Sequence, residues 1–513
     1  FHPDPTVERK SGFLIPSINS SSRTSFVKTP YFYAISENKD MTLTPRLYSN
    51  NKILVQSEYR QQNKNSDHIV DISLFKEKDN DSKNHFFYEY NKNLNYLNFE
   101  ESKLNFLVQK TSNDTYLKLN KIKSEIFDNT DILETSLNFD FYSDDFSVET
   151  EFKAYEDLNK NLSDRYEFIL PRLNLTKKID NKTKLDGNFS FNSKNLIKNY
   201  QTNIFEKINN NNLLFSSNQK ITSKGFKNDY KFLIKNANTD SQNSSSYKDG
   251  SDSYLSGIFQ FNSSLPLIKE SNELSKVLKP KLSLKLGPDN SKNMSDDFIR
   301  FDVNNIYNLD RLSSGETVEG GASITYGNDF TIFDKINSRD IFAIKIANNL
   351  RLNENDDLPR NNQINQKTSN FFSEIIYSPN EIFTTKYNAS TKNNLTDNSY
   401  ENLSAKISVN NFVTSFDYLN ENNSSEKNSY LISNIKYSID GRNNISYEIR
   451  ENKKTNLTEY YNFIYQYKND CLAASIEYNK DYYEDRDIKP EENIFLKLTI
   501  IPFSETSSPN LKK

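Results

Sequence analysis

The chain is dominated by short stretches in which apolar and polar residues alternate. Within residues 137–141, Leu137, Phe139 and Phe141 fall on one face of an extended strand and the polar residues fall on the other. The same period of two recurs at residues 147–154, 188–191, 282–286 and 496–500. Because successive side chains of a strand point to opposite faces, this pattern predicts an all-β chain. No segment has a convincing helical period, and no linker divides the chain into two domains.

Two all-β architectures produce this alternation. A soluble sandwich turns the polar face of each strand to water, whereas a membrane barrel turns its apolar face to lipid and its polar face to a hydrated lumen. In a barrel, the residues that face lipid would include Leu137, Phe139, Val148, Phe152, Leu496 and Leu498, and those that face the lumen would include Asp140, Glu149, Glu151 and Lys497. Such charges are costly against lipid and ordinary in water. The alternation therefore favours a barrel without excluding a sandwich.

The composition restricts how the chain can enter a membrane. A mean hydropathy of -0.81 with 35% hydrophobic residues is close to that of disordered chains. However, 31 Tyr and 36 Phe argue against disorder, and a net charge of -4 supplies little self-repulsion. No run approaches the roughly 18 apolar residues of a membrane helix. Any insertion into a membrane must therefore use strands.

The length of the chain sets the size of such a barrel. A membrane strand takes about 9 to 11 residues, and with its turn or loop a repeat of roughly 20 is reasonable. The 513 residues then allow a large single-chain antiparallel barrel of about 24 to 26 strands. Polar stretches at residues 239–252, 353–370 and 419–429 are predicted to be long loops, and Asp440 with Gly441 a tight turn.

Two prolines interrupt the first two predicted strands. Pro16 and Pro30 each remove a backbone N–H from the hydrogen-bonded ladder. In a closed barrel the first strand must pair with the last, at residues 494–503, so the missing bonds weaken the line of closure. Proline also protects exposed sheet edges, but a closed barrel has none. The predicted weak seam comprises Phe13, Ile15, Pro16 and Pro30 near the start of the chain and Phe495, Lys497 and Thr499 near its end.

Several blocks of the sequence resemble the LptD family of lipopolysaccharide-assembly proteins. They are RKSGFLIPS at residues 9–17, TPYFY at 29–33, LTPRLYS at 43–49, YNLDRL at 307–312 with Gly315, Gly320 and Gly321 after it, NDC at 469–471, and YYEDRDIKP at 482–490. The resemblance implies a barrel in a Gram-negative outer membrane that inserts lipopolysaccharide into the outer leaflet. It also implies a lateral gate between the first and last strands, where acyl chains enter the membrane while the sugars pass through the lumen.

The resemblance also implies boundaries and partners. Residues 1–10 would be the exit from an N-terminal periplasmic jelly-roll domain, residues 11–503 the barrel, and residues 504–513 a C-terminal tail. An LptE-like lipoprotein would plug the lumen, and a periplasmic bridge of other Lpt proteins would deliver the lipid. No nucleic-acid partner and no cofactor is expected. The single cysteine, Cys471, is either a small packed strand residue or half of a disulfide, and the resemblance implies a disulfide partner in the periplasmic domain.

The sequence contains few candidate catalytic residues. His2, His68 and His85 are the three histidines, and the sequence has no GxSxG, GxGxxG or HExxH motif and no Cys/His cluster for zinc. Asp67 and His68 could form an acid/base pair, although an Asp-His step in a polar loop is ordinary. We therefore expect a transport protein that performs no covalent chemistry. The alternatives are a passive porin or nutrient-uptake barrel and, outside the membrane, a soluble secreted β-rich adhesin.

Overall fold

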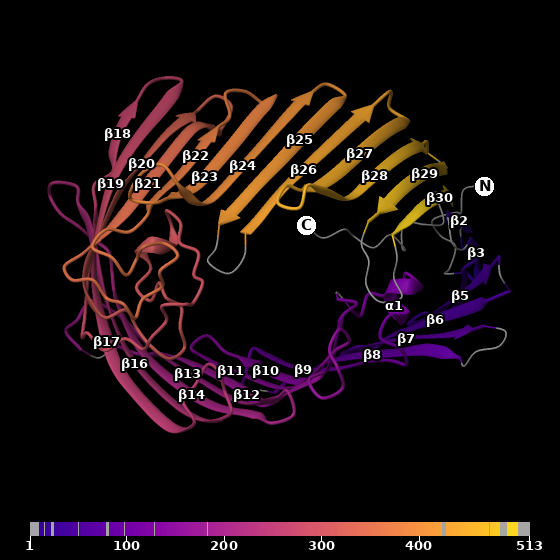
Figure 1. Cartoon of the computed structure of the whole chain (residues 1–513), viewed down its shortest axis with the longest axis horizontal. Coiled ribbons are helices and arrows are strands. Elements are labelled where there is room, and N and C mark those ends of the chain that lie inside the picture. The colour runs from indigo at the N-terminus through magenta and orange to yellow at the C-terminus, as the bar shows by residue number, and fades with distance from the viewer. Residues whose placement is uncertain are drawn as a thin grey trace.

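The computed structural model shows one antiparallel sheet that curls round and closes on itself into a wide barrel (Figure 1). It describes residues 10–14, 16–21, 25–49, 51–77, 82–96, 98–127, 129–181, 183–422, 427–470, 472–482 and 490–500. Ile15, Cys471, almost all of the expected exit segment and the expected C-terminal tail lie outside these ranges.

The strands of the first half are β1 (Gly12–Phe13), β2 (Ser17–Ser21), β3 (Phe26–Lys28), β4 (Tyr31–Ser36), β5 (Lys39–Tyr48), β6 (Ile53–Gln62), β7 (Ser66–Lys76), β8 (Lys83–Asn93), β9 (Glu101–Thr111), β10 (Ile132–Tyr142), β11 (Phe146–Asp157), β12 (Tyr166–Ile179), β13 (Gly187–Tyr200), β14 (Ile204–Ser217), β15 (Lys220–Ile221) and β16 (Lys227–Gln242). The later strands are β17 (Gly250–Ser264), β18 (Leu267–Glu270), β19 (Leu274–Gly287), β20 (Gly321–Asp334), β21 (Arg339–Arg351), β22 (Phe371–Tyr377), β23 (Phe383–Thr391), β24 (Asn398–Val409), β25 (Phe412–Asn422), β26 (Lys427–Ser438), β27 (Asn443–Asn452), β28 (Leu457–Lys468), β29 (Leu472–Asp481) and β30 (Glu491–Ile500). Two short helical segments are α1 (Tyr116–Leu119) and η1 (Asn305–Tyr307).

A ring of 26 antiparallel strands forms the barrel wall, and β2 pairs with β30 to close it. The other segments of the 30-stranded sheet, β1, β4, β15 and β18, pair beside β4, β5, β16 and β19 and lengthen the wall locally. The all-β barrel and its predicted size are therefore confirmed for the described residues.

The loop predictions were right only in part. β16 runs to Gln242 and β17 begins at Gly250, so half of residues 239–252 is strand. Similarly, residues 423–426 alone separate β25 from β26, where a loop over 419–429 was predicted. Thr239 and Ser241 are buried on the inner face of β16, and polar residues of this kind make a lumen-facing strand look like a loop in sequence. Residues 353–370 do form a loop, and Asp440 with Gly441 do form a turn.

The two faces of the strands are oriented as predicted. On β30, Lys497 shares a face with Asn493, whose side chain contacts a loop inside the ring. Leu496 and Leu498 lie on the opposite face and are 47% and 41% exposed. On β10 and β11, Asp140 lies opposite Glu149, and Leu137 and Phe139 lie opposite Phe152 and Thr150 on the other face. Charged and apolar side chains are thus separated across the wall.

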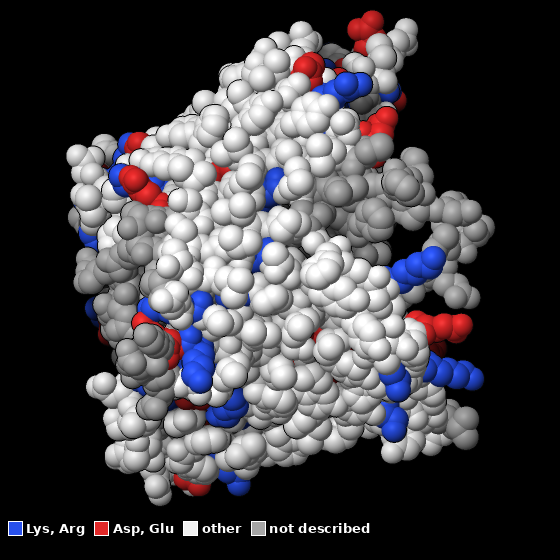
Figure 2. Space-filling model, turned by 90° about the vertical axis from the view of Figure 1, so that its right-hand side faces the viewer, with Lys and Arg blue, Asp and Glu red and all other residues white. Residues whose placement is uncertain are grey.

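The outer surface near the closure of the ring is mostly uncharged. Figure 2 shows a broad white face on which most of the Lys, Arg, Asp and Glu residues lie toward two opposite rims. An uncharged band between charged rims fits the hydrocarbon core of a bilayer between its two interfaces. In the part of the chain that the structure describes, no helix is long and apolar enough to cross a membrane.

Cysteine labelling tests this assignment of faces. In a Cys471→Ser background, Asp140→Cys and Glu149→Cys should react with a membrane-impermeant thiol reagent, because lumen water reaches their side chains. Phe139→Cys and Phe152→Cys should react at a rate about tenfold lower or lower still, because lipid covers their side chains. Equal labelling of the two pairs in intact bilayers would contradict the assignment.

Three loops fold into the ring (Figure 1). Residues 112–131, which contain α1, pack beside the closure between β2 and β30, and we call them the seam loop. Residues 288–320 and 352–370 pack together against the wall at β16–β22, and we call them the plug loops. The lumen is therefore partly occupied by the chain itself.

Candidate functional site

The barrel closes through a short pairing between β2 and β30, which we call the seam. Among the described residues it spans five positions, from Ser17 opposite Lys497 to Ser21 opposite Asn493. The neighbouring pair β29 and β30 spans ten positions. Each ladder hydrogen bond contributes about 0.5–1.5 kcal/mol net and more where no water competes. The seam is therefore held by fewer bonds than the adjacent strand pair.

The two prolines lie between the short strands at the start of the chain. Pro16 separates β1 from β2, and Pro30 separates β3 from β4. As a result β3 pairs over only three positions with β2 on one side and with β5 on the other. The amide of Leu14 still donates to the Pro30 carbonyl at 2.8 Å, so the proline accepts a bond but cannot return one. The weak region thus extends from the seam across β2 and β3.

The predicted seam residues at the first strand are only partly in the seam. Phe13 lies on β1 opposite Tyr31 of β4, with the ring centres 5.0 Å apart, and does not pair with β30. Thr499 pairs with Ala473 of β29, and no described residue of β2 lies opposite it. Ile15 lies outside the described residues. β2 begins directly after Pro16, and β1, on the other side of this proline, pairs with β4.

The lumen side of the seam contains a buried amide without hydrogen bonds. Asn19 is 2% exposed, lies opposite Phe495, and neither its Oδ1 nor its Nδ2 has a partner among the described residues. An unpaired buried amide costs roughly 1–3 kcal/mol. Lys497, opposite Ser17, bonds instead to Glu477 of β29 at 2.5 Å. The closed seam therefore carries a penalty that exposure of Asn19 to lumen water would relieve.

The seam loop is anchored to the inner wall next to the seam. Tyr116 and Leu117 are buried and form an apolar core with Leu54 of β6 and Phe87 of β8. Arg46 of β5 donates to the backbone carbonyl of the seam loop at residue 120, over 2.5 Å. The loop is thus fixed both by apolar burial and by a charge-assisted bond to its backbone.

A buried polar network fastens the same loop to β7 and β8. Ser73 Oγ lies 2.6 Å from Tyr116 OH and 2.5 Å from His85 Nδ1, and His85 Nε2 lies 3.2 Å from Asp71 Oδ1. These residue types also form hydrolytic triads. Here the side chains of His85 and Asp71 have no exposed surface, and Tyr116 engages the serine hydroxyl. The network therefore attaches the loop and does not present a nucleophile to a substrate.

The acid/base pair considered for Asp67 and His68 does not form. These consecutive residues of β7 point to opposite faces of the wall. His68 Nδ1 lies 2.9 Å from Tyr88 OH, and its ring stacks on Tyr90 with the ring centres 4.6 Å apart. Asp67 accepts a hydrogen bond from Asn91 at 2.9 Å on the other face.

One side chain of the seam loop reaches across to β30. Lys121 Nζ donates to Asn493 Oδ1 over 2.8 Å and lies 5.4 Å from the centre of the Phe495 ring. The preceding residue is bonded to Arg46 of β5, and β2 and β3 stand between β5 and β30 in the sheet. The seam loop thus bridges the weak strands from inside the barrel. Separation of β30 from β2 would have to break the Lys121 contact.

The plug loops have an apolar core that includes the wall. Phe301, Ile306, Leu358 and Ile364 are buried there together with Phe372 of β22. The block YNLDRL at residues 307–312 belongs to these loops, so a block on which the family resemblance rests lies inside the barrel. Gly315 in the same loop leaves no space for a side chain, because a Cβ would lie 2.6 Å from the Asn210 amide.

A buried charge cluster holds the plug loops against the wall. Glu319 accepts hydrogen bonds from Arg311, with Arg311 Nε at 2.5 Å, and from Arg351. Burial alone would raise the pKa of Glu319, but Arg311, Lys285 and Arg351 outweigh it and lower this pKa to about 2. Two arginines and the amine of Lys285 thus surround one carboxylate, which stays ionised at neutral pH.

Two lysines of the wall are also buried under the plug loops. Lys235 Nζ lies 2.6 Å from Asp310 Oδ2 and 3.2 Å from the carbonyl oxygen of Thr317. Lys285 donates to the Asn308 carbonyl and is 2% exposed. Lys285 thus lies on the lumen face of β19, where a carbonyl of the plug loops accepts its hydrogen bond.

The contacts of Lys121, Asn493 and Asn19 were missed in the sequence. One signal was present: Tyr116 and Ile122 are large apolar residues in a stretch without period-two alternation. A loop of that composition needs a surface on which to bury them. The sequence did not indicate that this surface is the lumen wall beside the last strand.

Comparison with known proteins adds a family and several relatives. A family model described as LPS transport system D matches residues 83–436. The LPS-assembly protein LptD of Pseudoalteromonas atlantica is 27% identical over 188 residues, which are 36% of this chain and 24% of that protein. The LPS-assembly protein LptD of Pseudomonas putida is 37% identical over 82 residues, which are 16% of this chain and 9% of that protein. The matches thus span about a quarter of the first relative and under a tenth of the second.

Solved structures of other barrels are similar over most of the chain at low identity. The FrpB iron transporter from Neisseria meningitidis is 9% identical with a TM-score of 0.36, covering 91% of this chain and 81% of that one. The alcaligin outer-membrane receptor FauA from Bordetella pertussis is 7% identical with a TM-score of 0.30, covering 94% of this chain and 75% of that one.

Proposed function

This chain belongs to the LPS transport system D family, and on that basis we propose that its barrel moves lipopolysaccharide into the outer leaflet of the outer membrane. The barrel is an integral protein of that membrane. The sugars pass through the polar lumen, and the acyl chains leave sideways between β2 and β30. No covalent chemistry takes place in this scheme.

The observation that carries the proposal is the construction of the seam. Its five paired positions, the two prolines beside it and the unpaired amide of Asn19 all lower the cost of separating β2 from β30. A lipid with both sugars and acyl chains needs an opening that joins a hydrated lumen to the bilayer. A passive porin needs no such opening, because its solute stays in water throughout.

Depletion of the protein tests the proposed function. In cells that make it from a repressible promoter, newly made lipopolysaccharide should stop reaching a membrane-impermeant surface label as the protein is diluted by growth. Uptake of small hydrophilic solutes should stay unchanged over the same period. Loss of solute uptake with normal surface lipopolysaccharide would instead support a porin.

The Lys121 contact is expected to restrain the seam. Lys121→Ala removes one hydrogen bond to β30, worth about 1 kcal/mol, so the amides of β2 should exchange with solvent about fivefold faster. Amides of β27 and β28, which do not pair with either seam strand, should be unaffected. Lys436→Ala, which removes a lumen-facing lysine of β26, is the matched control and should change neither region. Unchanged exchange in β2 would show that the seam loop does not hold the seam.

Restoration of the missing N–H groups should have the opposite effect. Pro16→Ala with Pro30→Ala can add up to two hydrogen bonds to the ladder, so the seam should open less often. Lipopolysaccharide should then reach the surface at a rate about fivefold lower or lower still. The barrel should still fold and migrate as a heat-modifiable band. Pro280→Ala in β19 is the control, since it restores an N–H far from the seam. Normal export by the double variant would show that the two prolines only interrupt the strands and do not affect opening of the seam.

Partners and boundaries follow from the family and are part of the proposal. An LptE-like lipoprotein occupies the lumen, and a periplasmic Lpt bridge delivers lipid through an N-terminal periplasmic domain. Residues 1–10 are the exit segment from that domain into the barrel. Cys471, which lies outside the described residues, pairs with a cysteine of that domain. The barrel then extends over residues 11–503, with a tail over 504–513.

A further inference from the structure

A row of cationic side chains crosses the seam on its lumen side. Arg46 of β5 lies opposite Lys28 of β3, and Lys28 in turn lies opposite Ser17 of β2. Across the seam, Ser17 lies opposite Lys497 of β30. Residues opposite each other in antiparallel strands share a face, and Arg46 bonds to the seam loop inside the ring. The whole row therefore faces the lumen, and no carboxylate interrupts it.

Lys28 lacks a counter-ion in this row. Its side chain is half-buried and forms no ion pair or hydrogen bond within the part of the chain that the structure describes. Arg46, Lys497 and the exposed Lys123 of the seam loop lie close enough to repel its ammonium group. Glu58 attracts this group, but it lies 3.3 Å from an arginine of its own strand, β6. Like charges on directly opposite strand residues are unfavourable, so an anion that binds Lys28 would relieve a repulsion.

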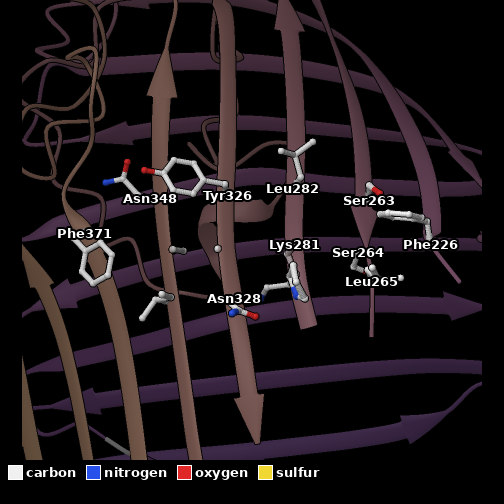
Figure 3. A pocket seen from close by; sticks show the side chains of 14 residues that line it. Phe226, Ser263, Ser264, Leu265, Lys281, Leu282, Tyr326, Asn328, Asn348 and Phe371 are labelled. Atoms are coloured by element: carbon white, nitrogen blue, oxygen red, sulfur yellow. The ribbon is translucent and has the colours of Figure 1, made fainter. Parts of the chain in front are cut away.

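Two half-buried lysines of the lumen face farther round the ring do have counter-ions. Lys281 of β19, labelled in Figure 3, has its Nζ 2.8 Å from Asp329 Oδ1. Lys345 of β21 has its Nζ 2.7 Å from Glu374 Oε1. The fold thus supplies a carboxylate to each of these two lysines and supplies none to Lys28. A bound ligand can provide the missing negative charge.

A phosphate group fits the charge and the spacing of the row. β3 and β30 are two strand spacings apart, about 10 Å, and the flexible side chains of Lys28 and Lys497 can close this distance over Ser17. Lys497 donates one N–H to Glu477 and keeps two others. Ammonium and hydroxyl groups are common donors to phosphate oxygens. A phosphate monoester has about -1.5 to -2 charges and three acceptor oxygens at pH 7, which suits several cations better than a single carboxylate does.

We propose that Lys28, Ser17 and Lys497 bind a phosphate group on the lumen side of the seam. During transport its source is the lipopolysaccharide that leaves between β2 and β30, an identification that rests on the proposed function. In a phosphorylated glycolipid, this charge marks the junction between the sugars and the acyl chains. A phosphate held beside the opening keeps the sugars in the lumen and directs the acyl chains at the gap.

Chemical footprinting of lysines tests the site in the purified full chain. An amine-reactive reagent modifies the folded barrel in detergent, and mass spectrometry gives the rate at each lysine. Lipopolysaccharide that carries its lipid phosphates, at about ten times its apparent Kd, should slow the modification of Lys28 and Lys497 about tenfold. Lys436, which faces the lumen from β26, should react at an unchanged rate and serves as the internal control.

Two further ligands identify the group that is recognised. The same lipopolysaccharide after enzymatic removal of its lipid phosphates should protect neither Lys28 nor Lys497. Equal protection by the intact and the dephosphorylated lipid, or no protection by the intact lipid, would overturn the proposal. Protection by inorganic phosphate without protection by intact lipopolysaccharide would assign the site to a free anion and overturn the lipid as its occupant.

Substitution of Lys28 tests its part in the site. Lys28→Gln removes the charge and should raise the apparent Kd for intact lipopolysaccharide, measured by protection of Lys497, about tenfold. Lys28→Arg keeps the charge and should stay within about threefold of the native value, as should the control Lys436→Gln. Heat-modifiable migration checks that each variant is folded. An unchanged Kd for Lys28→Gln would overturn the proposal.

The binding assay involves no transport. A barrel that fails to export lipopolysaccharide can still bind a phosphate at Lys28, and that result would contradict only the proposed function. Conversely, a barrel that exports normally through the seam but shows no phosphate-dependent protection would contradict only the site.

Discussion

A disulfide across the seam should stop export of lipopolysaccharide. Ser17 and Lys497 lie directly opposite each other on β2 and β30, so Ser17→Cys with Lys497→Cys can be joined by an oxidant in the assembled protein. A covalent bond of this kind cannot be broken by the few kcal/mol that open a strand pair. Surface lipopolysaccharide labelled after oxidation should fall nearly to zero, and reductant should restore it.

The matched control is a second lock of the same chemistry in a different strand pair. Lys436 and Ser446 are opposite each other on β26 and β27 and face the lumen as the seam pair does. Lys436→Cys with Ser446→Cys should form a disulfide to a similar extent and leave export normal. A seam lock that forms completely while export continues at the normal rate would eliminate the lateral opening.

Loss of the buried carboxylate in the plug loops should strongly destabilise the barrel. Glu319→Gln leaves Arg311, Lys285 and Arg351 buried without their counter-charge, and such a change costs about 3–5 kcal/mol. The free energy of unfolding, measured by urea titration of the refolded barrel in detergent, should fall by that amount. Glu270→Gln is the control: it breaks an ion pair with Lys335 in which the glutamate side chain is 64% exposed, and should cost under about 1 kcal/mol.

The same carboxylate predicts a pH dependence. The pKa of Glu319 is lowered in the folded protein, from an ordinary 4.5 to about 2, so its ionisation stabilises the fold above pH 4.5. That stabilisation, about 3 kcal/mol, should be lost as the pH falls from 4.5 to 2. The Glu319→Gln barrel should lack this part of the acid sensitivity. An identical acid profile for both proteins would show that the cluster does not hold the plug loops.

The fold could be predicted because its signals are local. Alternation in residues such as Leu496, Lys497 and Leu498 fixes a strand and its two faces, and chain length limits the number of strands. The same logic failed at Thr239 and Ser241, where a lumen-facing strand is as polar as a loop. Polarity separates loops from strands only where one face of the strand is apolar for its full length.

The candidate site could be predicted only where it depends on backbone chemistry. Pro16 and Pro30 mark the weak seam because a missing N–H has the same effect in any fold. The contact between Lys121 and Asn493 joins residues 372 positions apart, and it exists only because the ring closes. Likewise, Glu319 meets Arg351 of β21 because the loop at residues 288–320 folds inward, and no periodic pattern in the sequence marks a loop that folds inward.

Photo-crosslinking from the seam tests the central claim most directly. A photoreactive amino acid at position 18 or 496, on the lipid side of the seam, or at position 19, on its lumen side, is placed in the full protein during active export. If lipopolysaccharide leaves between β2 and β30, all three positions should crosslink to it while export runs. No crosslinked product should form when the energy supply of the export system is removed before illumination. Positions 434 and 437 of β26 should give little adduct under either condition. Crosslinks that are equal at the seam and at β26, or absent from the seam while export continues, would contradict the account.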